Sequence, residues 1–427
     1  MPKKKKKCSE IFKRLAAVTP GGVNSPFRSF HEVGGETLVL SHGMGSKVWD
    51  VDGKSYVDYL GAWGPAILGH AFPPVVAAAK KAVDASAVLG LSTKWEYEMA
   101  IEVQKAFPSI EMIRFVNSGA EAVESAIRLA RGATRKSKII RFEGGYHGHG
   151  DSILWTHGPE ERHTPEESGV PKGLVDETIV IPFNDPDSLL KTFHLYSGQI
   201  AALLVEPVGG SMTVVPPNPG FLERCRKITE DTGAVLIFDE VLTGFRIARG
   251  GAQERYRVDA DLTCLGKILG GGLPAGGYGG KKELMQQLAP LGIVYQAGTF
   301  SGNPVTMRAG CAALKAVASP KIYADLEKKT EKLLSGIREI AREKNIPIQT
   351  PHVGSMFAIV FHDKPITNYR ESLRVNTERY SQFFHAMLER GFLFPPSPTD
   401  AAVVSTAHTA KEINETLRVF RIVAREL

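Results

Sequence analysis

A single lysine, Lys267, lies between an apolar run and a series of glycines in the stretch LTCLGKILGGGLPAGGYGG, residues 262–280. An amine at this place has three candidate roles: a surface charge, a phosphate ligand, or a nucleophile that binds a cofactor covalently. A phosphate loop of the common type has its lysine after the glycines and before Ser or Thr. Because Lys267 precedes the glycines, that role is disfavoured.

A nucleophilic lysine of this kind is typical of pyridoxal phosphate enzymes, which also need three further groups. A carboxylate must face the pyridine nitrogen, and Asp239 ends the apolar run AVLIF. An aromatic ring must cover the cofactor ring, and Tyr146 follows the run KIIRFEGG. Backbone amides must bind the phosphate, and Ser118 and Gly119 precede a predicted helix that begins near Ala120. Each signal alone is weak, but the set is specific.

Other chemistries have less support in the sequence. His147, His149 and Asp151 form a possible set of metal ligands, but no further cluster supports them, so we expect no metal. No GxGxxG follows an early strand, which disfavours a dinucleotide-binding fold.

The elements that must position these residues alternate between strand and helix. Apolar runs rich in β-branched residues, which predict strands buried on both faces, are MIRFVNSG, KIIRFEGG, ETIVIPFN, IAALLVEP and AVLIFDEV. Predicted helices include PPVVAAAKKAVDAS, AEAVESAIRLARGAT and LERCRKITEDTG. The fold class is therefore α/β, a mostly parallel sheet with helices on both faces, and its site should lie at the carboxyl ends of the strands.

The two ends of the chain have a different character. A helix is predicted over residues 9–19, followed by strands in 36–43 and 46–59 with a hairpin turn at Asp52-Gly53. After residue 310, long helices alternate with short strands, which indicates a smaller α+β domain. We therefore predict an N-terminal segment, 1–60, a large domain, 61–310, and a small domain, 311–427. The polar stretch 156–173 is either a surface insertion or a lid over the site.

Composition restricts the setting of the protein. The formal net charge of +6 falls close to neutral without the run Lys3–Lys7, which is expected to be a solvated, disordered tail and not a nucleic-acid site. The four cysteines form no CxxC pair, so a cytoplasmic location is expected. No apolar run reaches membrane-spanning length, and no signal peptide is apparent.

Taken together, these stretches resemble the class III family of pyridoxal-phosphate aminotransferases with fold type I. The resemblance covers roughly residues 9–427 and is closest to the aminomutase branch, which converts glutamate-1-semialdehyde to 5-aminolevulinate for porphyrin biosynthesis. The residues that carry it are PGGVNSPFR, AWGPAILGHA, RFVNSGAEA, KIIRFEGGYHGH, LIFDEVLTGFR, GGAQERY, DLTCLGKILGGGLPAGGYGG, YQAGTFSGNP and STAHT.

The resemblance implies a fold with a seven-stranded sheet, a cofactor that alternates between pyridoxal 5'-phosphate and its pyridoxamine form, and a homodimer with shared active sites. Lys267 would be the catalytic lysine. The cofactor-binding residues implied are Ser118, Gly119, Ala120, Tyr146, His147, Asp239, Val241 and, from the partner subunit, Thr299. The substrate-binding residues implied are Ser25, Arg28, Trp63, Glu206 and Asp400.

Several positions depart from the family pattern. Ala120 replaces the usual Thr beside the phosphate, Gly145 replaces a Cys, and Asp400 replaces a Glu near the substrate amine. The loop is charged where the family has small residues, namely at Glu160, Glu161, Arg162, His163, Glu166 and Glu167. The rival prediction is a class III aminotransferase that acts on another amino compound and a keto acid. The segment AAVVSTAHT lacks the arginine that such enzymes use for a distal carboxylate, which favours the aminomutase.

Overall fold

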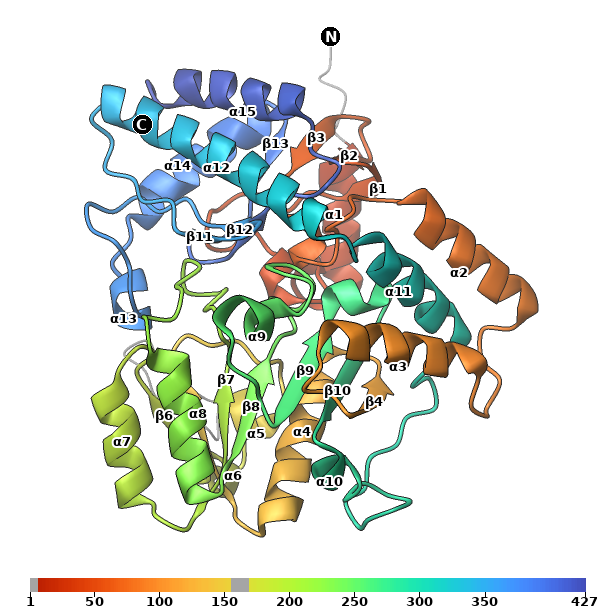
Figure 1. Ribbon diagram of the computed structural model, residues 1–427. Helices are drawn as coiled ribbons and strands as arrows, with labels where there is room; N and C mark the ends of the chain where they lie inside the picture. The colour runs from red at the N-terminus through yellow and green to blue at the C-terminus, as the bar shows by residue number, and fades with distance from the viewer. Residues whose placement is uncertain (1–6, 155–168) are drawn as a thin grey trace. The chain divides into compact units, whose positions relative to one another are not determined.

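The computed structural model describes residues 7–154 and 169–427, which form two compact units (Figure 1). The first unit comprises the chain up to Phe72 with 321–366 and 370–427, and the second comprises 73–320 and 367–369. The limits expected from sequence were 60 and 310. The second limit falls inside a helix, Pro304–Ala316, and 61–72 is tied to the first unit because Gly45 and His70 exchange backbone hydrogen bonds of 2.9 and 2.7 Å.

The second unit is built on a seven-stranded sheet. In spatial order its strands are β4 (Met112–Val116), β10 (Gly276–Gly280), β9 (Leu262–Gly266), β8 (Val235–Asp239), β7 (Ile200–Val205), β5 (Lys138–Phe142) and β6 (Thr178–Ile181). Only β10 runs antiparallel to its neighbours among these strands. The predicted mostly parallel α/β sheet is therefore confirmed.

Strand β10 was not among the strands predicted from the sequence. Glycine has low strand propensity, so the sequence gives no strand signal there. The structure explains the glycines by close approach of neighbouring backbone: a Cβ at Gly276 would overlap the carbonyl oxygen of Ser118, and one at Gly280 that of Asp261. The helical turn just before it does bend through left-handed glycines, with φ of +62° at Gly271 and +98° at Gly272.

Helices surround this sheet (Figure 1). They are α2 (Pro73–Ala85), α3 (Lys94–Ala106), α4 (Gly119–Thr134), α5 (Asp151–Leu154), α6 (Lys172–Val175), α7 (Pro186–Leu195), α8 (Phe221–Thr232), α9 (Gly251–Tyr256), α10 (Lys282–Met285) and α11 (Pro304–Ala316), with a 3₁₀ turn, η4, at Lys267–Gly270. Helix α13 (Tyr369–Ser372) spans the limit between the units.

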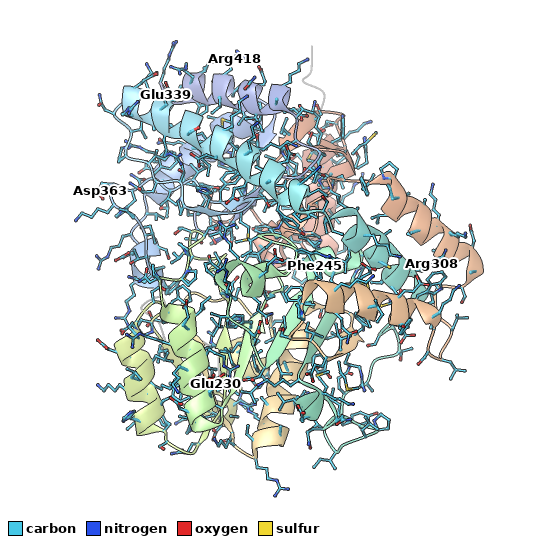
Figure 2. All side chains as sticks on the ribbon, in the orientation of Figure 1. Glu230, Phe245, Arg308, Glu339, Asp363 and Arg418 are labelled. Atoms are coloured by element: carbon cyan, nitrogen blue, oxygen red, sulfur yellow. The ribbon has the colours of Figure 1, made fainter. Side chains whose placement is uncertain are left out.

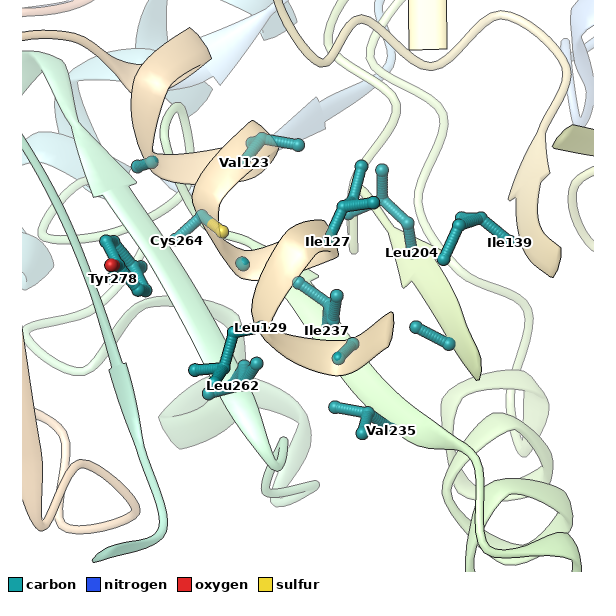
Figure 3. Packing of buried hydrophobic residues seen from close by; sticks show 14 of the residues in the cluster. Val123, Ile127, Leu129, Ile139, Leu204, Val235, Ile237, Leu262, Cys264 and Tyr278 are labelled. Carbon is teal, nitrogen blue, oxygen red and sulfur yellow. The ribbon is translucent and has the colours of Figure 1, made fainter. Parts of the chain in front are cut away.

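Helix α4 covers one face of the sheet and forms the core with it (Figure 3). Its apolar side chains recur at helical spacing, for example at Val123, Ile127 and Ala130, and all three are buried. They pack with alternate residues of the strands, such as Ile237 and Cys264. Full burial of a Val, Ile or Leu side chain stabilises the fold by about 1.5–3 kcal/mol, so this interface fixes the position of the start of α4.

The first unit contains two small sheets. One has the order β1 (Leu40–Met44), β2 (Lys47–Asp50), β3 (Ser55–Asp58) and β13 (Phe392–Leu393); the other has β11 (His352–Val353), β12 (Met356–Phe357) and β14 (Ala402–Val403). Its helices are α1 (Lys7–Val18), α12 (Pro320–Glu343), α14 (Thr377–Glu389) and α15 (Ala410–Val423), with 3₁₀ turns η1 (Pro20–Gly22), η2 (Pro26–Arg28) and η3 (Gly61–Trp63). Because β3 pairs in parallel with β13, the N-terminal segment and the C-terminal region share one sheet.

Several expectations concern residues at the margin of this description. Lys3 to Lys6 of the basic run and the charged loop residues 160–167 lie outside the described residues, whereas Lys7 begins α1. All four cysteines are free thiols. Within residues 7–154 and 169–427, no helix has both the length and the apolar character needed to cross a bilayer.

Candidate active site

Three adjacent strands of the large sheet place charged side chains at one edge. Asp239 is the last residue of β8, Glu206 follows β7, and Lys267 follows β9. These strands are parallel neighbours, and Asp239 is paired with Cys264 near the end of β9. The three side chains therefore meet at the carboxyl edge of the sheet, where sites of such folds lie. Strand β4 also ends at this edge, since it runs antiparallel to β10, which is itself antiparallel to β9.

Asp239 is held by a buried hydrogen bond to histidine. Its Oδ2 lies 2.7 Å from Nδ1 of His147, and its Oδ1 accepts a 3.0 Å hydrogen bond from the amide of Val241. The side chains of His147 and Asp239 are only 1% and 4% exposed, so solvent does not compete for this contact. The carboxylate is thus fixed at the carboxyl edge of the sheet, called the strand edge below.

The loop that carries His147 is itself positioned by a buried arginine that sequence reasoning missed. Arg141, on β5, is 1% exposed and donates a 3.1 Å hydrogen bond to the carbonyl of Gly145. Burial lowers the pKa of its guanidinium to about 10. A single arginine inside the apolar run KIIRF is the signal that could have revealed it. A Cβ at Gly145 would lie 2.9 Å from Nε2 of His147, so glycine leaves that nitrogen room.

Glu206 is a carboxyl in an unusual electrostatic environment. Burial raises its pKa well above the usual range, the negative charge of Asp239 raises it further, and the ammonium of Lys267 partly opposes both effects. Tyr146, which is 45% exposed, has a pKa raised by burial and by the same Asp239 charge. The charge of Asp239 thus acts on both Tyr146 and Glu206, and the charge of Lys267 acts on Glu206.

Lys267 lies beside two glycines, Gly119 and Gly266, that pack closely against Val241. Its φ is +49°, a left-handed conformation that is costly for a residue with a Cβ and that concentrates at functional sites. A Cβ at Gly119 would lie 2.8 and 2.9 Å from the two Cγ atoms of Val241, and one at Gly266 would lie 3.1 Å from Val241 Cγ1. Val241, Gly119 and Gly266 therefore interlock directly beside Lys267.

The start of α4 completes this edge. Ser118 is the N-cap, and its Oγ accepts a 3.1 Å hydrogen bond from the amide of Glu121. Ala120 contacts the backbone of the His147 loop so closely that a Cβ at Gly148 would lie 2.5 Å from its Cβ. The first amides of a helix attract anions through unpaired N–H groups and the helix dipole.

Glu240, next to Asp239, has a role that the sequence did not reveal. It is fully buried, and its carboxyl accepts hydrogen bonds from the amides of Ala252 at 2.8 Å and Gln253 at 3.0 Å and from the Thr243 hydroxyl at 2.5 Å. Burial raises its pKa to about 7. A side chain at Gly251 would overlap this carboxyl, which accounts for glycine at that position, φ +59°.

Apart from Glu206, the predicted substrate residues lie in the first unit, around two cavities. Arg28, Ala62 and Trp63 line a cavity of about 350 Å³ whose other walls are almost wholly apolar. Ser25 caps the turn η2 that carries Arg28, with its carbonyl 3.0 Å from the amide of Arg28. Asp400 lines a second cavity, with Phe27, His31 and Glu32 among its other walls. Arg28 and Asp400 thus belong to neighbouring cavities that share Pro396 and not to one.

The remaining predicted residue, Thr299, lies in an exposed stretch, 297–300, of the second unit. In the described part of the chain, no group of three or more His, Cys, Asp or Glu side chains is arranged to hold a metal. Within the same residues, two buried atoms of the strand edge, Nε2 of His147 and Oε2 of Glu206, have no hydrogen-bond partner.

The chain is similar to known proteins over nearly its whole length. The model of the family Aminotransferase class-III matches residues 30–416. Glutamate-1-semialdehyde 2,1-aminomutase of Desulfitobacterium hafniense is 50% identical over 420 residues, which cover 98% of each chain. An omega-transaminase from Sphaerobacter thermophilus has the same fold, with a TM-score of 0.92, 32% identity and coverage of 99% of this chain and 98% of that one. A transaminase with PLP bound has a TM-score of 0.88, 28% identity and coverage of 98% and 97%.

Proposed function

Because this chain belongs to the class-III aminotransferase family, as its motifs predicted, we propose that it converts glutamate-1-semialdehyde to 5-aminolevulinate with pyridoxal phosphate as cofactor. The observation that carries the proposal is the 50% identity, over 98% of both chains, to a glutamate-1-semialdehyde 2,1-aminomutase. The reaction moves an amine between two neighbouring carbons, and its product serves tetrapyrrole synthesis. The free cysteines fit a reducing compartment, and we propose a cytoplasmic location.

The residues of the strand edge fit pyridoxal phosphate. Asp239, buried and aimed by His147, suits a protonated pyridine nitrogen, since an anion there keeps that nitrogen charged. The interlocked Val241 and Gly119 form a surface without projecting side chains, on which a flat ring can lie. The amides at Ser118–Ala120 suit the phosphate. The unpartnered Nε2 of His147 and Oε2 of Glu206 are where polar groups of a ligand are wanted.

The bound cofactor supplies an electrophilic carbonyl for amine capture and a ring that withdraws electrons. The residues of this chain do the rest. Lys267 Nζ would hold the cofactor covalently at rest and, once released, would deliver a proton to the substrate carbon that gains the amine or remove one from the carbon that loses it. Glu206, whose pKa burial and Asp239 raise, would sit protonated at the cofactor face and donate a hydrogen bond. Tyr146 would cover the ring.

The first-unit cavity supports a short carboxylate as substrate. Among its lining residues only Arg28 is charged, and Leu38, Leu60 and Pro396 are typical of the apolar remainder. One guanidinium in an apolar wall favours a single carboxylate attached to a short aliphatic chain. Asp400, in the adjoining cavity, is one methylene shorter than the Glu of the family pattern and would face the substrate amine across a longer gap.

A homodimer is part of this proposal. The second unit exposes large apolar side chains around Thr299, with Ile293 92%, Tyr295 71% and Phe300 59% exposed. Apolar groups in such concentration mark protein interfaces. Ile293→Asp should therefore produce monomers in sedimentation velocity and weaken cofactor binding, while the control Leu195→Asp, at a position 68% exposed on α7, should leave both unchanged. A dimeric Ile293→Asp protein would refute this interface.

The activity is tested by supplying glutamate-1-semialdehyde as the only substrate to the cofactor-loaded protein. Formation of 5-aminolevulinate without an added amine donor or keto acid is the expected result. Turnover that requires both an amine donor and a keto acid would instead identify the rival function, an aminotransferase on another amino compound.

The cofactor assignment has its own test. The purified protein should be yellow, hydroxylamine should remove the colour, and borohydride should fix the cofactor to the chain. Lys267→Ala should bind the cofactor without forming the borohydride-stable adduct. The control Lys281→Ala removes a different lysine of the same unit, whose ammonium forms a 2.6 Å ion pair with Asp261, and this variant should be labelled like the parent. A colourless parent protein would end the proposal.

A further inference from the structure

The turn that carries Trp63 has an unusual backbone. Four successive residues have positive φ: Gly61 at +56°, Ala62 at +55°, Trp63 at +65° and Gly64 at +116°. Residues other than glycine rarely adopt this region, and two such residues in succession persist only where surrounding contacts enforce the conformation. Ala62 and Trp63 line the same cavity as Arg28, so the strained turn forms a wall of the proposed substrate site.

A buried carboxylate holds this turn. Asp58, at the end of β3, is 4% exposed, and its Oδ1 accepts hydrogen bonds from the amides of Leu60 at 2.9 Å and Gly61 at 3.1 Å. Its Oδ2 lies 2.6 Å from Nε2 of His70. One carboxylate therefore connects both ends of the segment 60–70, through the amides at its start and the imidazole at its end.

The other side of the segment is fixed by backbone contacts. The carbonyl of Tyr59 accepts a 2.8 Å hydrogen bond from the amide of Val403, and that of Ile67 accepts one of 2.8 Å from Thr406. A Cβ at Gly61 would overlap Cγ2 of Val403, so the turn cannot relax toward that strand. Trp63 in turn packs on Phe27, the neighbour of Arg28, with ring centroids 5.7 Å apart.

From these contacts we infer that Asp58 and His70 are positioning residues for substrate recognition. They hold the left-handed turn 61–64 so that Trp63 stands beside Arg28 and narrows the cavity around the substrate carboxylate. The inference rests on the proposed function for the identity of the substrate. It adds that carboxylate recognition depends on a carboxylate that contacts neither substrate nor cofactor.

The test compares variants by steady-state kinetics on the cofactor-loaded enzyme. Asp58→Ala should raise KM for glutamate-1-semialdehyde by about tenfold with kcat changed by less than about threefold, the pattern of lost binding rather than lost chemistry. Asp58→Asn, which keeps an acceptor for both amides, should recover most of the loss. Adding Ala62→Gly to Asp58→Ala should also lower KM, because glycine adopts positive φ without strain.

A double-mutant cycle separates positioning from general stability. In a Trp63→Ala background, Asp58→Ala should change KM by less than about twofold, since contacts that act through one residue are not additive. Equal KM effects with and without Trp63, or a fall in kcat with KM unchanged, would overturn the inference. If the parent enzyme makes no 5-aminolevulinate, the proposed function fails first. The inference is then judged by calorimetric measurement of 5-aminolevulinate binding. Asp58→Ala should bind it more weakly than the parent, and an unchanged affinity would overturn the inference.

Discussion

Glu240 offers a quantitative test of the electrostatics beside the proposed cofactor site. Its carboxyl is fully buried, and burial raises its pKa from 4.5 to about 7. A raised pKa in the folded state means that the folded chain keeps a proton that the unfolded chain releases. The stabilisation is therefore complete below pH 4.5 and is lost as pH rises through 7.

The perturbation is Glu240→Gln, a neutral side chain of nearly the same shape. Its amide oxygen can accept from the amides of Ala252 and Gln253, as Oε1 of Glu240 does, and its NH₂ can donate to the Thr243 hydroxyl. The contacts of Oε1 are kept at every pH, the hydrogen bond with Thr243 reverses its direction, the 2.9 Å contact of the Ala252 amide with Oε2 is lost, and the titration is removed. A carboxyl with pKa values of about 7 folded and 4.5 unfolded contributes about 2.5 kcal/mol more at pH 5 than at pH 8.

The assay is urea unfolding of the parent and the variant at pH 5, 6, 7 and 8 with saturating cofactor. The stability of Glu240→Gln relative to the parent should rise by about 2.5 kcal/mol from pH 5 to pH 8. The control is Glu230→Gln, on the exposed side of α8 in the same unit (Figure 2), where the side chain is 57% exposed. Its difference from the parent should stay constant. A constant difference for Glu240→Gln as well would mean that Glu240 is ionised in the folded protein at neutral pH, contrary to the argument from burial.

Three further results are expected at the strand edge and the first-unit cavity. Gly119→Ala should destabilise the fold by about 1–3 kcal/mol in thermal unfolding, because its Cβ would lie 2.8 Å from Val241, and adding Val241→Ala should restore stability; no recovery would refute the interlock. His147→Ala should weaken cofactor binding by about 1.5–3 kcal/mol in absorbance titration, because it removes the 2.7 Å contact to Asp239; unchanged affinity would refute the role given to that contact. Arg28→Gln should raise KM for the semialdehyde at least about tenfold with little change in the cofactor spectrum, and an unchanged KM would place the carboxylate elsewhere.

What the sequence predicted well depends on local patterns. The run AVLIF predicts a strand by itself, and because sites of such sheets lie at the carboxyl ends of the strands, Asp239 could be placed there without a structure. Ser118 could likewise be placed at a helix start, and it is the N-cap of α4. The homodimer and the roles given to all the candidate site residues stay predictions.

What the sequence did not predict depends on partners distant along the chain. The glycines of β10 give no strand signal, because their reason is the backbone of Ser118 and Asp261. From the sequence, Glu240 is an ordinary acidic residue that follows a strand. Its burial depends on the amides of Ala252 and Gln253, which donate hydrogen bonds to it only in the folded chain. The sequence gives no signal for Asp58 either. The role proposed for it depends on His70, twelve residues later, whose Nε2 lies 2.6 Å from Oδ2 of Asp58 in the folded chain.

The glycines at this site restrict which residues can stand there, although few of the residues take part in the chemistry. Lys267 has a left-handed backbone conformation. Beside it, Gly266 and Gly119 leave room for the side chain of Val241. A methyl group at either glycine would push Val241, and with it the surface proposed for the cofactor ring. A change of substrate within this scaffold should therefore arise at Arg28, Trp63 and Asp400, whose surroundings are open cavities, while the segments beside Lys267 admit almost no variation.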